Sequence, residues 1–376
     1  MLNGLSTVRG LLKVQSILID NSVFRLHYKI TVVVLLAFSL ITTSGQFFGD
    51  PMDCYFPDYP STSLNTYCYI QSTFLVARSA THAAGKGIPH PGLTGHTEED
   101  TLKFYGYYQW VFITLFVQAI FFYAPHYIWK ASEGGTMKML AIDIASPVVS
   151  AECIRKNTEP LVEYFCTTLR SHNSYAYKYF LCEVLNLINI IGQICFINAF
   201  IGEEFRYYGI YVLIFKWKEQ LKERMTNPME EIFPTVTKCS YKTYGPSGSL
   251  QNREGICVLA QNSVNQKIYV FLWFWFNILA IISALVIIYR IVTIIFPSIR
   301  VYEFRSSSKM NRARDINVVV HKLRIGDWFL MRMLQQNINS LAYRELIFCM
   351  AQRFDSGVCS SCLKPLSMLC VNCAHV

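Results

Sequence analysis

Four long stretches without formally charged side chains are the main feature of the sequence. They contain 20, 26, 19 and 22 residues, and they lie between Lys29 and Asp50, Lys103 and Lys130, Glu183 and Glu203, and Lys267 and Arg290. A transmembrane helix needs about 17–25 predominantly apolar residues. The pattern therefore predicts four spans, which we place at residues 30–49, 104–129, 179–202 and 268–296.

The second stretch has aromatic side chains at both of its ends. They are Tyr105, Tyr107, Tyr108 and Trp110 at one end and Tyr123, Tyr127 and Trp129 at the other. Amphipathic rings of this kind prefer the two headgroup levels of a bilayer. Pro125 lies near one end, where a lost backbone hydrogen bond and a bend cost least. These features favour a spanning helix over residues 104–129.

The four spans leave five connecting and terminal segments. They are an N-terminal segment (1–29), three loops (50–103, 130–178 and 203–267) and a C-terminal tail (297–376). Basic side chains precede the first span, and acidic ones follow it. The positive-inside rule then places both termini and the 130–178 loop in the cytoplasm and the other two loops outside the cell. Nine basic residues in the 203–267 loop run against this assignment, but long loops follow the rule poorly.

Composition agrees with a membrane protein. The chain has 376 residues, of which 52% are hydrophobic and only 16% are charged, whereas soluble domains have about 25% charged residues. The net charge of +9 would also suit a nucleic-acid partner, but its placement around the spans indicates membrane topology instead. The sequence therefore predicts contact with a lipid bilayer and no nucleic acid.

Two further segments have helical character. Residues 1–29 form a loosely amphipathic pattern, typical of a membrane-surface anchor or of a segment folded into a pore mouth. Residues 325–354 repeat apolar positions at helical spacing and are expected to form a helix that packs with the cytoplasmic loop. The predicted fold class is an all-α membrane protein with a four-transmembrane-helix protomer, disulfide-stapled extracellular loops and a helical cytoplasmic lobe.

Cysteines follow the predicted topology. Of thirteen in the chain, two lie in each outside loop: Cys54 and Cys68 in the first, Cys239 and Cys257 in the second. Two cysteines per loop in oxidising surroundings indicate two disulfides, for which the sequence allows three connectivities. Bridges of this kind either simply staple the loops or hold them in a fixed shape for docking.

The tail ends with two CxxC pairs, formed by Cys359 and Cys362 and by Cys370 and Cys373. Only seven residues separate the pairs, whereas zinc ribbons have about 15–20. Metal binding, S-acylation at the membrane surface and a disordered terminus all remain open for this segment. We predict no cofactor.

Polar side chains cluster toward the outer end of the first span. They are Ser39, Thr42, Thr43, Ser44 and Gln46, and they are candidates for lining an aqueous pore. A polar residue in a span can equally bond to its own backbone. Gly-rich phosphate loops, the Gly-X-Ser-X-Gly elbow and the His-Glu-X-X-His motif are all absent from the sequence, so no enzymatic activity is predicted.

Several motifs resemble those of innexins, the invertebrate gap-junction proteins. Tyr107-Tyr108-Gln109-Trp110-Val111 is similar to the YYQWV signature that begins the second transmembrane helix in that family. Further similar stretches are Asp20 to His27, Phe233 to Cys239, Tyr244 to Ser249, Tyr269 to Phe276, and Ile325 to Leu330. The matches follow the family's order and spacing over nearly the whole chain.

The resemblance implies a structural subunit of a gap-junction channel at the plasma membrane. By this resemblance, protomers form a homo- or hetero-oligomeric ring, octameric in this family, with the first helix and the N-terminal segment lining the pore. Two rings in apposed membranes dock through the outer loops and pass ions and small metabolites between cells. The family's bridges join the two loops, which would pair Cys54 with Cys257 and Cys68 with Cys239.

Two other classes of protein need stapled outer loops. One is an undocked, pannexin-like hemichannel that releases small molecules. The other is a four-span, claudin-like adhesion or barrier protein, although the Trp and Gly-Leu-Trp pattern of that family is absent from the first loop. The sequence also lacks an Asn-X-Ser/Thr glycosylation site. Because a bulky glycan would obstruct docking, this absence permits the docked channel.

Overall fold

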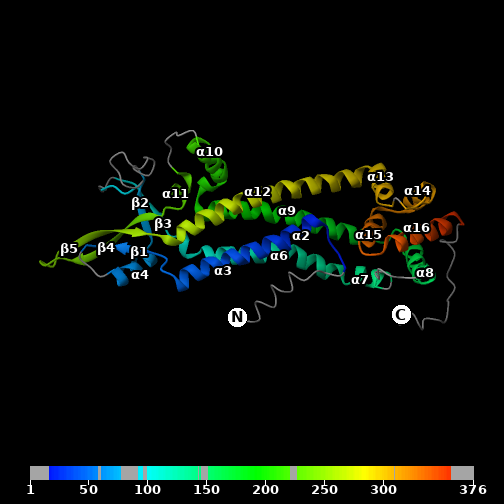
Figure 1. Ribbon diagram of the computed structural model, residues 1–376, viewed down its shortest axis with the longest axis horizontal. Coiled ribbons are helices and arrows are strands. Elements are labelled where there is room, and N and C mark those ends of the chain that lie inside the picture. The colour runs from blue at the N-terminus through cyan, green and yellow to red at the C-terminus, as the bar shows by residue number, and fades with distance from the viewer. Residues whose placement is uncertain are drawn as a thin grey trace. The chain divides into compact units, whose positions relative to one another are not determined.

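A computed structural model describes residues 17–57, 61–77, 92–95, 100–142, 144, 151–220, 227–308 and 310–356. The chain divides into two compact units. Unit 1 comprises Met1–Lys29, Tyr123–Leu187 and Ile282–Val376, and unit 2 comprises Ile30–Phe122 and Ile188–Ile281. The CxxC cysteines and residues 1–16 lie outside the described residues. Figure 1 shows the elements of both units.

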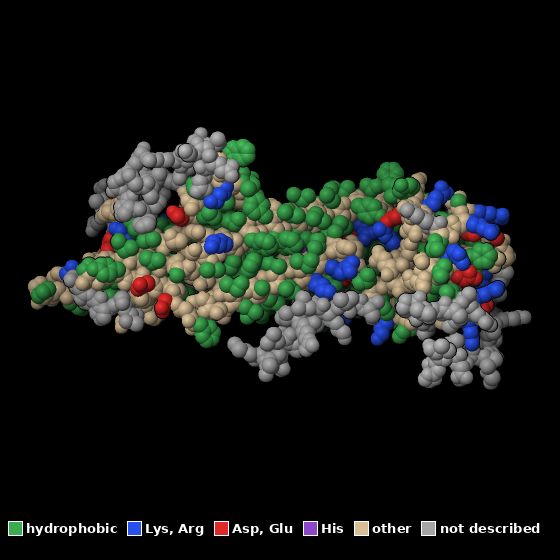
Figure 2. Space-filling view, in the orientation of Figure 1, with side chains coloured by type: hydrophobic (Ala, Val, Ile, Leu, Met, Phe, Trp, Pro, Cys, Tyr) green, Lys and Arg blue, Asp and Glu red, His purple; other side chains and the backbone are tan. Residues whose placement is uncertain are grey.

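Among the described residues, four helices are long and apolar enough to cross a membrane, which confirms the predicted number of spans. The first is Ser22–Phe48, built from α2 (Ser22–Arg25), a π-helical turn (Leu26–Thr31) and α3 (Val32–Phe48). The others are α6 (Val111–Glu133), α9 (Asn173–Ile201) and α12 (Ala260–Ile295). Many hydrophobic side chains are visible on the surface along these helices (Figure 2), as expected of surfaces that face lipid.

Three of the helices begin earlier than predicted. The first begins at Ser22 rather than 30, the third at Asn173 rather than 179, and the fourth at Ala260 rather than 268. The reason is that an uncharged stretch marks only the part of a helix that lies in the hydrocarbon core of the bilayer. The helix itself continues beyond the core, with charged residues in its end turns.

The second helix begins later than predicted, and the prediction of helix from residue 104 is wrong. Leu102–Tyr105 forms strand β3, and Tyr107–Gln109 forms a single 3₁₀ turn before α6 begins at Val111. Aromatic residues suit a strand as well as a membrane interface, so an uncharged aromatic stretch does not separate the two.

Unit 1 contains a lobe of short helices in addition to parts of the spanning helices. These helices are α7 (Thr136–Ala141), α8 (Ala151–Thr167), α13 (Pro297–Ser307), α14 (Ala313–Lys322), α15 (Ile325–Gln335) and α16 (Ser340–Asp355). The predicted packing of the tail on the 130–178 loop is present, because α16 contacts α8. The helix predicted over 325–354 is two helices, since Asn339 caps α16 by accepting a hydrogen bond from the Leu341 amide.

Asp327 joins the lobe to the turn between α8 and α9. Its carboxylate accepts hydrogen bonds from the backbone amides of Arg324 (3.2 Å) and Arg170 (3.0 Å) and lies 2.8 Å from His172 Nδ1. The side chain is fully buried, so these contacts take the place of its hydration. One residue of the Ile325–Leu330 motif therefore fixes two segments of unit 1 to each other.

Unit 2 contains a five-stranded antiparallel sheet that the sequence analysis did not predict. Its order is β1-β5-β4-β2-β3, with β1 at Asp53–Tyr55, β2 at Thr73–Val76, β3 at Leu102–Tyr105, β4 at Val236–Tyr244 and β5 at Leu250–Val258. The helices beside it are α4 (Ser61–Gln71), α10 (Tyr208–Gln220) and α11 (Pro228–Ile232). Strands from the 50–103 and 203–267 segments thus pair in one sheet (Figure 1).

Candidate docking domain and pore-lining residues

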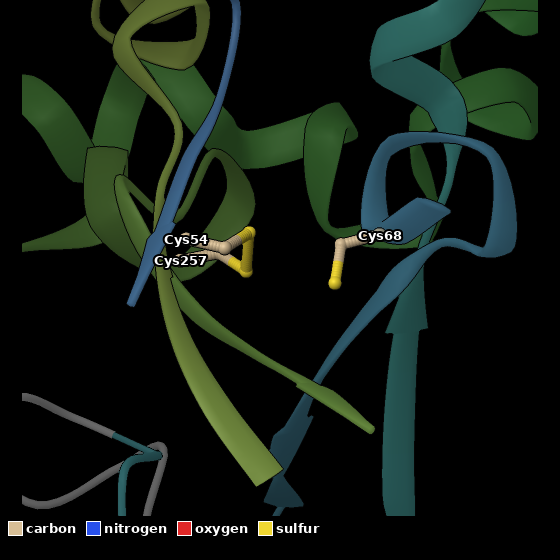
Figure 3. A group of neighbouring side chains, drawn as sticks. All are labelled: Cys54, Cys68 and Cys257. Carbon is tan, nitrogen blue, oxygen red and sulfur yellow. A yellow bond between two sulfur atoms is a disulfide. The ribbon is translucent and has the colours of Figure 1, made fainter. Parts of the chain in front are cut away.

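Two disulfides join the segments that build the sheet. Cys54 on β1 is bonded to Cys257 on β5, and Cys68 on α4 is bonded to Cys239 on β4. Cys54 and Cys257 are also direct partners in the register of the two strands, and Figure 3 shows their bond beside Cys68. All four side chains are at most 1% exposed. These are the pairs that the family resemblance implies.

The sulfur atoms of Cys54, Cys68 and Cys257 lie within 4.8 Å of one another, close enough to be considered as a metal site. Zinc and other soft metals bind the thiolate form of cysteine. Each of the three sulfurs is part of a disulfide instead. The cluster therefore serves as a double crosslink and does not fit a metal ion.

Helix α4 is held to the sheet by a side-chain amide as well as by its disulfide. Asn65 accepts a hydrogen bond from the Cys54 amide (2.8 Å) and donates one to the Asp53 carboxylate (3.3 Å). These bonds lie at the start of β1, a strand of only three residues. The 50–103 segment thus has a fixed shape at the place where the bridges attach it to the 203–267 segment.

The first tyrosine of the signature binds the 203–267 segment. Tyr107 donates a hydrogen bond from its hydroxyl to the backbone carbonyl of Ile232 (3.0 Å), and its ring meets the ring of Phe233 edge-on at 5.4 Å. Both partners lie at the end of α11, just before β4. This contact is internal to the protein, so Tyr107 has a structural role that its interpretation as part of a membrane belt did not include.

The next two signature residues bind the 50–103 segment. Tyr108 donates to the backbone carbonyl of Tyr69 (3.4 Å), and Gln109 donates to the carbonyls of Tyr69 and Ile70. These carbonyls belong to the last turn of α4, which has no helical partner for them. Burial raises the pKa of Tyr108 to about 12, so its hydroxyl stays protonated and remains a donor. Tyr108 and Gln109 thereby complete the C-terminus of α4.

The last two signature residues begin the spanning helix. Val111 is the first residue of α6 and is buried, whereas Trp110 is exposed. The signature is therefore a junction in which one short turn holds both loop segments to the start of α6. The signature could be recognised in the sequence. Its role as a junction could not, because the residues that it contacts lie about 40 and 125 positions away in the chain.

Strands β4 and β5 extend beyond the rest of the sheet as a hairpin. Among the described residues, strand β2 pairs with β4 only at Lys238, and β1 pairs with β5 only as far as Ile256. From Cys239 opposite Gly255 to Tyr244 opposite Leu250, the two strands pair with each other. Gly248 in the turn has φ +77°, a left-handed conformation that glycine adopts without strain.

The last pair of residues before the turn of this hairpin is apolar and accessible. Tyr244 and Leu250 are directly opposite each other in the register and are 77% and 62% exposed. An isolated hairpin of two strands is marginally stable in water, but this one continues into a base with two disulfides. The hairpin is therefore the best candidate in unit 2 for contact with another protein.

The structure separates the polar residues of the first span into two groups. Ser39 and Thr42 are buried within unit 2; Ser39 donates to the Phe112 carbonyl and Thr42 to the Phe38 carbonyl, each at 2.9 Å. Thr43 is half-buried and donates to the Ser39 carbonyl (2.7 Å). Ser44 is exposed and Gln46 is half-buried. Burial removes Ser39 and Thr42 as pore-lining candidates, while Thr43, Ser44 and Gln46 stay predictions.

The Asp20–His27 motif anchors the chain in front of the first span. Asn21 caps α2 by accepting a hydrogen bond from the Phe24 amide (2.6 Å), and its side-chain amide donates to Glu183 (2.7 Å). Its backbone amide donates to the Tyr179 hydroxyl (3.0 Å). Glu183, in turn, forms a buried bidentate ion pair with Arg290. The sequence analysis gave no signal for this long-range pair.

Asp20 is fully buried beside the same anchor. One carboxylate oxygen lies 3.5 Å from Arg25 Nε, and the other lies 3.6 Å from His126 Nδ1. Burial raises the pKa of Asp20 from 3.8 to about 6, and a hydrogen bond with Tyr28 and the positive charges of Arg25 and Lys29 only partly oppose this. The folded protein therefore binds a proton at Asp20 at a pH where the unfolded chain has released it.

Asp20→Asn is expected to raise the stability at pH 7 and to reduce its dependence on pH. Because the folded pKa is the higher one, this group contributes most below pH 3.8, and its contribution is lost as the pH rises through about 6. Lowering the pH from 7 to 5 should add about 1 kcal/mol to the free energy of unfolding through Asp20. Thermal unfolding of the purified protein at both pH values measures this.

The exposed Asp355→Asn is the matched control, because it removes a carboxylate from the surface of unit 1. It should leave the pH dependence of the wild type unchanged. An equal pH dependence in Asp20→Asn and wild type would contradict the assigned role of the buried carboxyl.

Comparison with known proteins gives the same family throughout. The innexin family model matches residues 20–354. The chain is 45% identical to innexin inx2 of Drosophila melanogaster over 97% of this chain and 99% of that protein. It is also 45% identical to innexin inx2 of Schistocerca americana, over 94% and 99% of the two chains. Innexin shaking-B of Drosophila melanogaster is 41% identical, over 94% and 95%.

Proposed function

Because the chain belongs to the innexin family and is a subunit of gap-junction channels, we propose that its disulfide-linked sheet docks onto an apposed ring. The ring would contain eight copies of this chain, or this chain with other innexins, and the second ring would lie in the membrane of the adjacent cell. The joined rings would pass ions and small metabolites between the two cells. The family consists of channel proteins rather than enzymes.

The protruding β4–β5 hairpin carries this proposal. Docking needs a surface that projects from the membrane and keeps its shape before the partner arrives, because preorganisation lowers the cost of association. The two disulfides supply the fixed base, and the exposed pair of Tyr244 and Leu250 supplies apolar contact area. Loops that only connected helices would need neither feature.

The same features support an orientation of the protein in the plasma membrane. Disulfides persist in oxidising surroundings, so the segments at 50–103 and 203–267 would face the outside of the cell. Both termini and the 130–178 loop would then be cytoplasmic, in agreement with the positive-inside rule. Junctional rather than intracellular membranes are the place where such a sheet meets its partner.

Replacing Tyr244 and Leu250 together by Asp is expected to reduce the current between paired cells at least tenfold. Two buried and unpaired carboxylates per hairpin would oppose close contact with the apposed ring. Dual whole-cell voltage clamp on cells that express only this protein measures the current, and dye uptake by single cells measures undocked channels. Dye uptake should persist, because neither substituted residue belongs to a spanning helix.

Tyr302→Asp is the matched control, since Tyr302 is an equally exposed tyrosine on α13 of unit 1 and should leave the current unchanged. Wild-type current in the hairpin variant would overturn the proposed docking surface. Dye uptake without any current in the wild type would favour the undocked channel over the docked one. If neither signal appears although the protein reaches the surface, a second innexin is needed in the ring.

The first span would line the pore with the face of its helix α3 that is not packed against the rest of unit 2. Its exposed positions Ala37, Leu40, Ile41 and Ser44 recur at the spacing of one helical face. Ser44→Cys is expected to react with a water-soluble methanethiosulfonate reagent and to lower single-channel conductance. Thr42→Cys, two positions away but buried, should be unaffected. Equal reactivity at both positions would contradict this choice of face.

A further inference from the structure

Helix α10 has one face buried against the rest of unit 2. The helix follows α9 after Gly202 and a 3₁₀ turn at Glu203–Tyr207. Tyr208 and Val212 are buried, and the Tyr208 ring packs against Phe205 and Phe233 at 5.7 and 5.9 Å between centroids. These contacts fix the rotation of α10 about its own axis, so the other face of the helix is defined.

That other face is apolar and exposed. Ile210, Leu213, Ile214 and Trp217 follow the i, i+3, i+4, i+7 spacing of one helical stripe. They are 45%, 56%, 41% and 70% exposed. Tyr207 and Tyr211 extend the same surface and are each 51% exposed. A soluble surface rarely carries so many large apolar side chains side by side, so the stripe needs an apolar partner.

The position of α10 along α12 indicates which partner this is. Gly209 lies directly on the ring of Trp273, where a Cβ atom would come within 2.1 Å of a ring carbon. Trp273 also donates a hydrogen bond from Nε1 to the Arg206 carbonyl (3.2 Å). Both contacts place α10 beside the part of α12 that begins its uncharged, membrane-spanning stretch (Figure 1).

Trp273 belongs to the aromatic run from Tyr269 to Phe276. Clustered tryptophan and tyrosine at the end of a span mark the headgroup level of a bilayer. A helix in contact with that run lies at the same depth, where its outward face meets lipid rather than bulk water.

We propose that α10 is an interfacial helix whose stripe from Ile210 to Trp217 inserts into the lipid leaflet next to the disulfide-linked sheet. The apolar side chains would enter the boundary between headgroups and acyl chains, as in helices that lie in the membrane plane. Lys216, an exposed basic side chain on the same helix, would stay near the lipid phosphates. The inference rests on the membrane spans and does not require docking.

This arrangement gives the 203–267 segment a second attachment. Its sheet strands are joined to the other loop by disulfides, and α10 would hold its first part against the membrane. The level of the sheet above the bilayer would then be set by lipid contact as well as by the lengths of the spanning helices.

Fluorescence quenching of Trp217 tests the proposal on the full-length protein in phosphatidylcholine vesicles. The difference in emission between wild type and Trp217→Phe is the contribution of Trp217, and the variant keeps an aromatic ring at an exposed position. In vesicles of phosphatidylcholine brominated at carbons 6 and 7, this contribution should fall at least twofold. Iodide present on both sides of the membrane should quench it little.

Ser247→Trp in the Trp217→Phe background provides the aqueous reference, because Ser247 is exposed in the hairpin turn. Its tryptophan should be quenched by iodide and not by brominated lipid. If Trp217 behaves like this reference, the stripe faces water and the proposal is wrong. If neither agent quenches Trp217, another protein surface, such as a neighbouring subunit, covers the stripe, and the proposal is equally wrong.

Discussion

Cys54→Ser and Cys239→Ser are each expected to abolish the current between paired cells while the four spans remain inserted. Each variant removes one of the two bridges between the loop segments, and loss of a native disulfide typically costs about 2–5 kcal/mol. Strand β1 has three residues, and β2 meets β4 at one register pair, so backbone pairing alone holds these elements weakly. The sheet should therefore lose its fixed shape, and the hairpin should lose the rigid base that supports it.

A single substitution also endangers the bridge that remains. The Cys257 thiol freed by Cys54→Ser lies within 4.8 Å of the Cys68 sulfur. A thiolate at that distance can attack the neighbouring disulfide and exchange with it. The double variant Cys54→Ser with Cys257→Ser removes one bridge without leaving a thiol. Coupling should be lost in this variant too, which separates the missing crosslink from disulfide scrambling.

Dual whole-cell voltage clamp measures the current, and surface biotinylation shows whether the protein reaches the plasma membrane. Cys195→Ser is the control, because Cys195 is an exposed free cysteine on α9 and should couple cells normally. Normal junctional conductance in the disulfide variants, at equal surface amounts, would refute the link between a stapled sheet and docking.

The spans were predictable because they depend on a local property. A helix of about 20 uncharged residues is long enough to cross the bilayer wherever it occurs in a chain. Each of the four predicted spans corresponds to a long apolar helix of the structure. The helix ends were less predictable. Residues 104–110 are as uncharged as the span that follows, yet they form β3 and a 3₁₀ turn, because their partners are in other parts of the chain.

The sheet was not predictable from local patterns for the same reason. Cys54 and Cys257 are separated by 203 positions in the sequence but are direct neighbours in the register of β1 and β5. The residues alone left three possible disulfide connectivities, and only the resemblance to innexins pointed to the pairs that the structure contains. Tyr107 and Tyr108 likewise gave the signal of a membrane belt, although they hold the loop segments to α6.

The pairing of charged residues inside the spans could not be predicted from the sequence. The partner of Glu183 is Arg290, which lies on another helix, 107 positions away. The carboxylate accepts hydrogen bonds from Arg290 Nε (2.7 Å) and Nη2 (2.9 Å) and from Asn21 (2.7 Å). Both charged side chains are less than 10% exposed. The pair joins α9 and α12 to the segment that leads into the first span.

Glu183→Ala is therefore expected to be the most destabilising single change in unit 1. It leaves Arg290 buried without its counter-charge, and breaking a buried pair in this way costs about 3–5 kcal/mol. The guanidinium would keep its contacts with aromatic rings, which compensate a small part of the charge; the ring centroids of Phe180, Phe329, Tyr179 and Tyr289 lie at 5.2, 5.6, 5.7 and 5.8 Å. The melting temperature of the purified protein should fall by roughly 4–6 °C.

Two further variants decide whether the unpaired charge is the cause. Glu183→Met combined with Arg290→Met removes both charges and should recover most of the lost stability, since apolar replacement of a whole buried pair is often neutral. Arg314→Ala breaks an exposed pair with Asp355 (3.8 Å) and should change stability by less than about 1 kcal/mol. If Glu183→Ala melted no lower than Arg314→Ala, or if the double variant melted lower than Glu183→Ala, the buried pair would not be what holds these helices together.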